Sequence, residues 1–176
     1  VYNGSWYILG LTAGTVNYRF RDFAIHGQTR KPQWLYMARA GIGRLEGNYF
    51  ILSGYRGQKQ LFTGQLSSAN TITVTGISAE AKWQLNRTSW LLAELAKSMA
   101  PDIRNNPSQE ATKLNNFSDK TNQALSLRFY SYLPRTASKI EAYYKHTGAN
   151  FQSFGHFQTN AAQESWYLKV EQPLFK

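Results

Sequence analysis

The chain has 176 residues, a formal net charge of +10, 42% hydrophobic residues and no cysteine. Its length predicts a single domain spanning residues 1–176. The absence of cysteine excludes disulfides, thiol catalysis and zinc–thiolate sites. No apolar run approaches the roughly 20 residues of a membrane-spanning helix, which excludes a helical membrane protein. The Lys and Arg residues form no basic run, so we expect no nucleic-acid partner.

The first third of the chain alternates apolar and polar residues in short segments, which predicts β-strands. The expected strands are Ser5–Leu9, Thr15–Ile25, Gln33–Gly43 and Asn48–Arg56. A break is expected at Thr12–Gly14 and a basic turn at Gly27–Pro32. Near Asp22 the apolar residues change parity, and a β-bulge would explain this change.

The same alternation continues through the rest of the chain. The expected strands there are Thr71–Asn86, Ser89–Ser98, Ala124–Leu133, Lys139–Thr147 and Ser165–Gln172. One of them has a helical alternative, because Leu91, Leu95 and Met99 also have helical spacing. The short turn before Ser89 favours a strand.

The connections between these strands alternate in length. Short turns are predicted at Arg44–Gly47, Asn86–Thr88 and Pro134–Thr136, and long loops at Gln58–Asn70, Met99–Gln123 and Gly148–Glu164. Membrane barrels have short turns at one end and long loops at the other. The sequence therefore predicts an all-β chain, an antiparallel up-and-down transmembrane β-barrel with about eight strands present, whose apolar face meets the lipid bilayer.

Four segments resemble repeated hairpins of large outer-membrane β-barrel proteins of Gram-negative bacteria. They are Gly47–Arg56, Leu92–Ser98, Tyr143–Phe151 and Glu171–Phe175. The resemblance implies a bacterial outer-membrane location and a barrel with more strands than this chain contains. Pro173–Lys176 looks like a turn that enters another strand, and the chain starts at Val1 without a signal peptide, so we expect part of a larger barrel.

If the apolar faces meet lipid, the charged residues of the opposite parity face the lumen. These are Arg19, Arg21, Arg39, Glu80, Lys82, Glu94, Arg128, Glu141, Lys145, Lys169 and Glu171. Two interpretations stay open: a mutually paired, solvated lining, or a filter that attracts anionic solutes because bases outnumber acids. A hairpin centred near Thr88 predicts that Lys82 lies opposite Glu94, whereas a centre at Arg87 would place Glu80 there.

The sequence contains no clear catalytic or metal-binding motif. His26, His146 and His156 have no acidic neighbours at metal-site spacing, and Gly-x-Ser-x-Gly is absent. We therefore expect no enzyme activity, metal or cofactor. The aromatic residues Phe151, Phe154 and Phe157 of the last long loop are candidates for contact with a partner, or for packing among themselves.

These observations predict an outer-membrane barrel that acts as a pore, a transporter or a secretion-system component, with other envelope proteins as possible partners. Two alternatives stay open. The first is a soluble lipocalin-like barrel with an apolar small ligand inside. The second is a structural or adhesive cell-surface module, for which the long loops are equally suitable.

Overall fold

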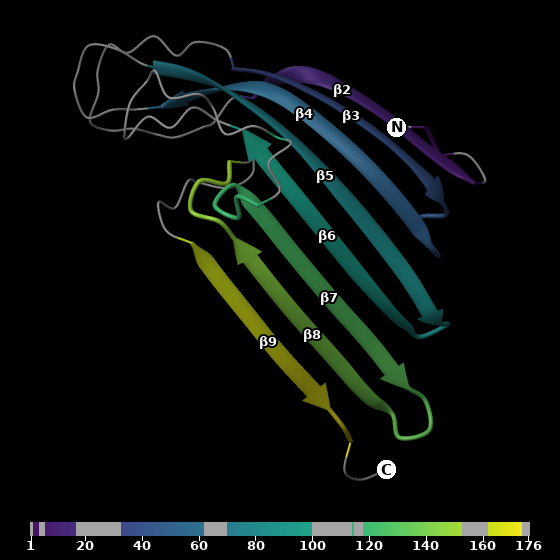
Figure 1. The fold of residues 1–176 in the computed structure, drawn as a ribbon. Coiled ribbons are helices and arrows are strands. Elements are labelled where there is room, and N and C mark those ends of the chain that lie inside the picture. Colours follow the sequence, from purple (N-terminus) through teal and green to yellow (C-terminus); the bar gives the residue numbers. More distant parts are fainter. Residues whose placement is uncertain are drawn as a thin grey trace, which may run out of the picture.

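The computed structural model describes residues 2–3, 6–16, 33–61, 70–99, 114, 118–152 and 162–173. They form one nine-stranded antiparallel sheet in which the strands follow each other in chain order (Figure 1). The strands are β1 (Tyr2–Asn3), β2 (Tyr7–Val16), β3 (Gln33–Gly43), β4 (Tyr49–Leu61), β5 (Asn70–Asn86), β6 (Ser89–Met99), β7 (Gln123–Leu133), β8 (Ser138–Thr147) and β9 (Gln163–Glu171). The predicted all-β class and the up-and-down order are confirmed.

The sheet is open. Strands β1 and β9 are its two edges, and no pairing between them closes it into a barrel in the described part of the chain. Among those residues there is also no helix that is long and apolar enough to cross a membrane.

Strand β2 is longer than the sequence predicts. The expected break at Thr12–Gly14 is wrong, because β2 continues through it and Ala13 pairs with Tyr36. Leu9, Leu11 and Ala13 keep one parity, so the alternation never breaks there. Thr15 and Val16 complete β2, whereas the rest of the predicted strand, the bulge near Asp22 and the turn at Gly27–Pro32 lie outside the described residues.

The segment with a helical alternative is a strand. Its backbone pairs on both sides, for example Leu95 with Ala79 of β5 and with Leu125 of β7. Two flanking strands satisfy the hydrogen-bonding groups of this segment, so tertiary pairing overrides the helical propensity of its Ala, Leu, Glu and Lys residues.

The short turns all lie at one end of the strands, which we call the short-turn end (Figure 1). In the first turn, Arg44 N–H donates to Asn48 O at 2.9 Å and Gly47 N–H to Arg44 O at 2.9 Å. Gly43 precedes it with a φ of 102°, a left-handed conformation that favours glycine. The other two connect β5 to β6 and β7 to β8. The longer connections join the strands at the opposite end, the long-connection end.

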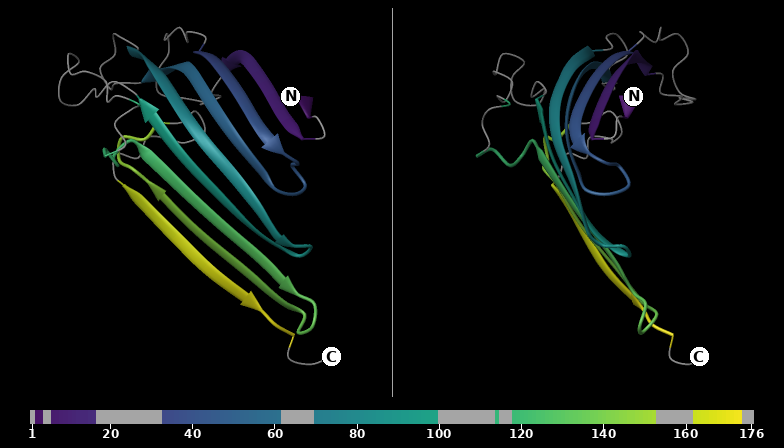
Figure 2. Two further views of the ribbon diagram at one scale, coloured as in Figure 1. Left: turned by 45° about the vertical axis from the view of Figure 1, so that its right-hand side comes forward. Right: turned by 90° about the vertical axis from the view of Figure 1, so that its right-hand side faces the viewer.

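The half of the sheet from β2 to β5 is curved, and the half from β6 to β9 is nearly flat (Figure 2). In the curved half Ile8, Ile51 and Val74 are 1%, 0% and 1% exposed, whereas Leu9 and Leu52 on the other face are 49% and 54% exposed. The face with the buried side chains is therefore the concave one.

Glycine placement explains this difference between the halves. In β2–β5, every glycine except Gly54 lies on the concave face by its cross-strand register: Gly10, Gly14, Gly41, Gly43, Gly57 and Gly76. Strands β6–β9 contain no glycine. Because glycine lacks a side chain, it lets a sheet bend toward the face on which it lies.

On the concave face, near the long-connection end, Tyr55 connects strand β4 to the segment that follows β8. Its ring lies over Gly76, where any added Cβ atom would overlap it. Its hydroxyl donates to Gln152 O at 2.8 Å, and Gln152 N–H donates to Ser98 Oγ at 2.7 Å. The segment after β8 is thereby tied to β4 and β6.

Gly76→Ala is expected to lower the free energy of unfolding by about 1–3 kcal/mol, because the methyl group displaces a Tyr55 ring whose hydroxyl is already engaged. The matched control is Gly54→Ala, where a Cβ would meet only Gly76 O, at 4.0 Å. Urea unfolding followed by tryptophan fluorescence compares the two. Equal losses in both variants would show that the Tyr55 contact is not the cause.

Candidate functional site

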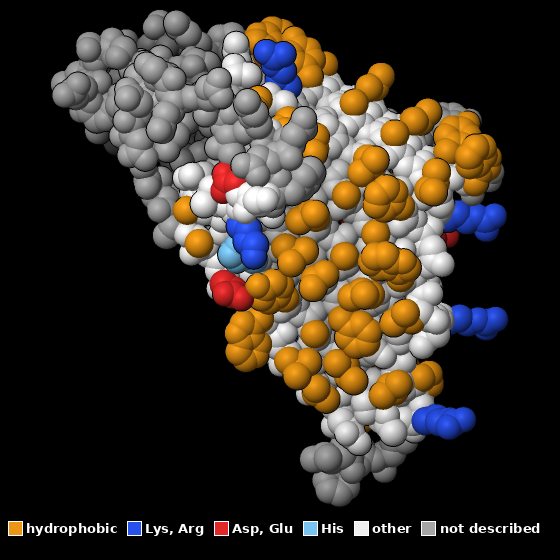
Figure 3. All heavy atoms as spheres, in the orientation of Figure 1, with side chains coloured by type: hydrophobic (Ala, Val, Ile, Leu, Met, Phe, Trp, Pro, Cys, Tyr) orange, Lys and Arg blue, Asp and Glu red, His pale blue; other side chains and the backbone are white. Residues whose placement is uncertain are grey.

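One face of the sheet, which we call the apolar face, is covered with exposed hydrophobic side chains over the whole width of the sheet (Figure 3). In the curved half this is the convex face. Exposure reaches 85% for Leu11 in β2 and 76% for Trp166 in β9. Its large members include Leu9, Leu11, Trp34, Tyr36, Ile42, Phe50, Leu52, Ile77, Trp83, Leu95, Leu127, Trp166, Leu168 and Val170.

Basic, acidic and histidine side chains on the apolar face are confined to its long-connection half. Among the described strand residues whose side chains are placed, they are Arg56, Lys97, His146 and Glu164. The Lys97 ammonium is buried and donates to Asn122 Oδ1 at 3.0 Å and to Asp119 O at 3.2 Å. Glu164 accepts from the Tyr144 hydroxyl at 2.8 Å. The short-turn half of this face carries no charge among those residues.

The opposite face, which we call the polar face, holds the predicted lumen residues. By cross-strand register, all nine that the structure describes share it: Arg39, Glu80, Lys82, Glu94, Arg128, Glu141, Lys145, Lys169 and Glu171. Arg19 and Arg21 lie outside the described residues. Lys139, which sequence reasoning omitted, lies on the same face opposite Glu171. Lys139 is two residues before Glu141 in the predicted strand, so the alternation of the sequence was enough to place both on the same face.

The predicted pairing of Lys82 with Glu94 is wrong. Glu80 lies opposite Glu94, and Lys82 lies opposite Leu92. The turn consists of Arg87 and Thr88 alone, and an irregularity between Gln84 and Asn86 shifts the register by one residue. This extra residue moves the effective centre of the hairpin to Arg87, which a turn prediction without the bulge does not detect.

Glu80 has a hydrogen-bond donor on the neighbouring strand β4. The Tyr49 hydroxyl donates to Glu80 Oε1 at 2.6 Å, a charge-assisted hydrogen bond. This bond satisfies one acceptor of the Glu80 carboxylate, whereas the two carboxylates remain directly opposite each other. Such like-charged cross-strand pairs are unfavourable.

On the polar face from β5 to β9, cations lie beside stacked aromatic rings in two neighbouring rows, which we call the ring ladder. Lys82 lies over the Trp90 ring at 5.8 Å, Trp90 and Tyr130 stack at 5.9 Å with 19° between planes, and Lys139 lies over Tyr130 at 5.8 Å. One row away, Arg128 lies 5.7 Å from the Tyr143 centroid, and Tyr143 contacts Tyr167 at 5.8 Å. Cation–π contacts of this kind are favourable, more so when desolvated.

Ion pairs connect the rest of this lining. Lys139 Nζ lies 2.7 Å from Glu141 Oε1, and Lys169 Nζ lies 2.6 Å from Glu171 Oε1. Most charges of the flat half therefore have a partner in a neighbouring strand or on the same strand. Sequence reasoning missed the ring ladder, because its rows depend on the register between four strands.

Of the loop aromatic and histidine candidates not yet placed, the structure describes one. Phe151 is partly buried and donates its N–H to Gly148 O at 3.1 Å, whereas Phe154 and Phe157 lie outside the described residues, as do His26 and His156. Within the described ranges, no three His, Asp or Glu side chains are grouped as a metal site.

The chain was compared with known proteins. No family model, no curated protein and no solved structure matches it.

Glu94→Gln is expected to raise the free energy of unfolding by about 0.2–1 kcal/mol, since it removes one of two facing carboxylates. Glu171→Gln serves as the control, because Glu171 pairs with Lys169 and should give no gain. Parallel denaturant titrations measure both. A destabilised Glu94→Gln variant would mean that Glu94 has a cationic partner in solution.

Asp119 predicts a local pH dependence. Hydrogen bonds from Thr121 Oγ1 at 2.7 Å and Thr121 N–H at 2.9 Å lower the pKa of the Asp119 carboxyl below its ordinary 3.8. A lowered folded pKa means that this stabilisation is complete above pH 3.8 and is lost as the pH falls through the folded value. The protection of the Thr121 amide against hydrogen exchange, relative to an unstructured peptide at the same pH, should therefore fall in acid, and Asp119→Asn should abolish that fall. An unchanged acid response in the variant would refute the assignment.

Proposed function

We propose that this chain forms part of the wall of a β-barrel in a bacterial outer membrane, with the apolar face in lipid and the polar face toward the lumen. One observation carries the proposal. Large hydrophobic side chains stay exposed over the whole width of the apolar face, and the described strand side chains in its short-turn half carry no charge. A water-exposed surface of this extent is unfavourable for a soluble protein, whereas charges on a lipid-facing wall are costly.

Strand length supports the same proposal. A strand that crosses a bilayer at a tilt needs about 9–11 residues. Six strands have this length: β2 and β8 with 10 residues, β3, β6 and β7 with 11, and β9 with 9. The remaining long strands, β4 and β5, have 13 and 17 residues and extend further at the long-connection end.

The direction of curvature favours a membrane barrel over a lipocalin-like one. A soluble barrel would bury its apolar side chains inside, on the concave face. Here the polar face is the concave one in β2–β5, where Ile8, Ile51 and Val74 are buried between glycines. A cell-surface module would have no need for an apolar face that extends over β2–β9.

Paired charges indicate what the polar face does within this proposal. The ladder and the ion pairs engage most cations of the flat half with rings or carboxylates. We therefore propose a structural, solvated lining that holds neighbouring strands together, in preference to an anion filter. Within this proposal, closure of the barrel requires further strands at the free edges of β1 and β9.

Tryptophan quenching tests which face meets lipid. The chain contains five Trp; Trp83 and Trp166 lie on the apolar face and Trp90 lies on the polar face. Three single-tryptophan variants, with the other Trp changed to Phe, are refolded into vesicles whose acyl chains carry bromine. Trp83 and Trp166 should be strongly quenched, and Trp90 should not.

Two outcomes would contradict the proposal. One is equal quenching at all three positions, because it would mean that the faces do not differ in lipid contact. The other is a monodisperse chain that stays in buffer and shows no quenching with vesicles. The latter result would favour the soluble alternatives.

A further inference from the structure

We propose that the long-connection half of the apolar face binds one anionic membrane lipid, with its phosphate on Arg56 and an acyl chain in the groove beside it. This inference rests on the proposed function, because it requires the apolar face to lie in a bilayer. It goes beyond that function by assigning a specific ligand to one part of the wall.

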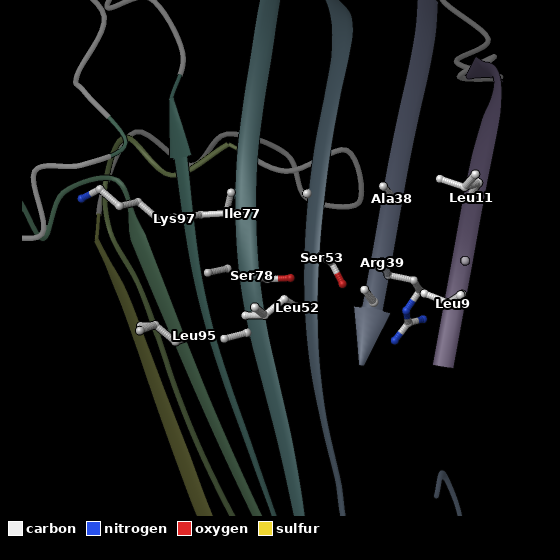
Figure 4. Close-up of a pocket in the computed structure, with 15 residues that line it drawn as sticks. Leu9, Leu11, Ala38, Arg39, Leu52, Ser53, Ile77, Ser78, Leu95 and Lys97 are labelled. Carbon is white, nitrogen blue, oxygen red and sulfur yellow. The ribbon is translucent and has the colours of Figure 1, made fainter. Parts of the chain in front are cut away.

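The groove comes from a change in side-chain size across the strands (Figure 4). It has a volume of about 720 Å³. Small residues on β3, β4 and β5, including Ala38, Gly54 and Ala79, form part of its floor, and Leu52 and Ile77 project between them. Larger side chains on the flanking strands, such as Leu11 and Leu95, border the groove. The exposed lining is almost entirely apolar, so the groove suits a hydrocarbon chain and offers little to a polar ligand.

Arg56 lies immediately beyond the long-connection end of this groove. It pairs across the strands with Tyr36 on one side and Thr75 on the other, two residues past Gly54 along β4. Its side chain is exposed, and within the described part of the chain no carboxylate lies within ion-pair distance. An arginine that faces lipid without an acidic partner is favourable only if its charge reaches the interface or an anion.

Two aromatic rings mark this level as the membrane interface. Trp34 and Tyr36 stack at 6.5 Å with 11° between planes and are 46% and 55% exposed on the same face. Trp and Tyr concentrate at the headgroup level of membrane barrels. A phosphate on Arg56 would therefore sit at headgroup depth, and its acyl chain would extend toward the short-turn end along the groove.

Charge complementarity favours an anionic lipid over a neutral one. Lys97 borders the groove on β6 and adds positive charge, although its ammonium is engaged by Asn122 and Asp119. Among the described strand residues, Glu164 is the carboxylate on this face, and it belongs to the far edge strand β9. A free phosphate would contact Arg56 alone and leave the groove empty, whereas a lipid uses both features.

Native mass spectrometry of the full chain tests the inference. The chain is reconstituted in nanodiscs of phosphatidylcholine with a minor fraction of phosphatidylglycerol, and the lipids that stay bound after release are counted. The wild type should retain one phosphatidylglycerol in preference to phosphatidylcholine. Arg56→Gln should reduce that preference about fivefold, which corresponds to one basic residue at an anionic interface.

Matched variants separate the two parts of the site. Arg56→Lys should retain the preference, because it keeps the charge. Arg87→Gln removes an exposed arginine from the turn between β5 and β6 and should change nothing. Ala38→Leu fills the groove and should weaken retention of any lipid while Arg56 remains.

The outcomes distinguish failure of this inference from failure of the proposed function. A chain that enters the bilayer but binds phosphatidylglycerol equally with and without Arg56 overturns the lipid site only. Full displacement of the bound lipid by excess inorganic phosphate would also overturn it. A chain that never enters the nanodisc overturns the barrel proposal and this site together.

Discussion

The structure depends on the cross-strand register, because a slip of one residue in any strand would exchange its two faces. The ladders from β2 to β9 are aligned so that apolar positions form continuous rows. One such row contains Leu9, Ala40, Leu52, Ala79 and Leu95. The irregularity in β5 lies at the end of the strand, beside the turn to β6. The register shift that it causes leaves only one residue pair, Asn86 with Ser89, on its turn side. The separation of apolar and charged side chains is thus a property of all strands together.

The two halves of the sheet use the polar face differently. In the curved half, glycines leave room for the sheet to bend, and Tyr55 fills the space above Gly76. In the flat half, bulky rings and long cations occupy the same face, and their stacking holds neighbouring strands side by side. Bending toward this ladder would compress its rings. One sheet therefore combines a curved half and a nearly flat half, and the size of the side chains on the polar face differs between them.

Much of the fold follows from local sequence signals, and the candidate site follows only in part. Period-two alternation and turn residues predict strands such as Gln33–Gly43, and the parity of Arg39 and Lys169 within their own strands is enough to assign both to the polar face. Local signals do not predict which residues lie opposite each other on neighbouring strands. Lys82 and Glu94 have compatible parities, but one extra residue near the turn places Glu80 opposite Glu94. The Trp90–Tyr130 and Tyr143–Tyr167 contacts depend on this kind of pairing as well.

By itself, the sequence determined the strand content, the up-and-down order and the division of side chains into two faces, because each of these depends on neighbours along the chain. Only the tertiary structure decided which face is concave, which residues are opposite each other and where Arg56 lies relative to the groove. Those features arise from hydrogen-bonded register and from glycines on separate strands, which no local pattern connects. The exposed apolar face is the joint result, and it is the basis for proposing lipid as its environment.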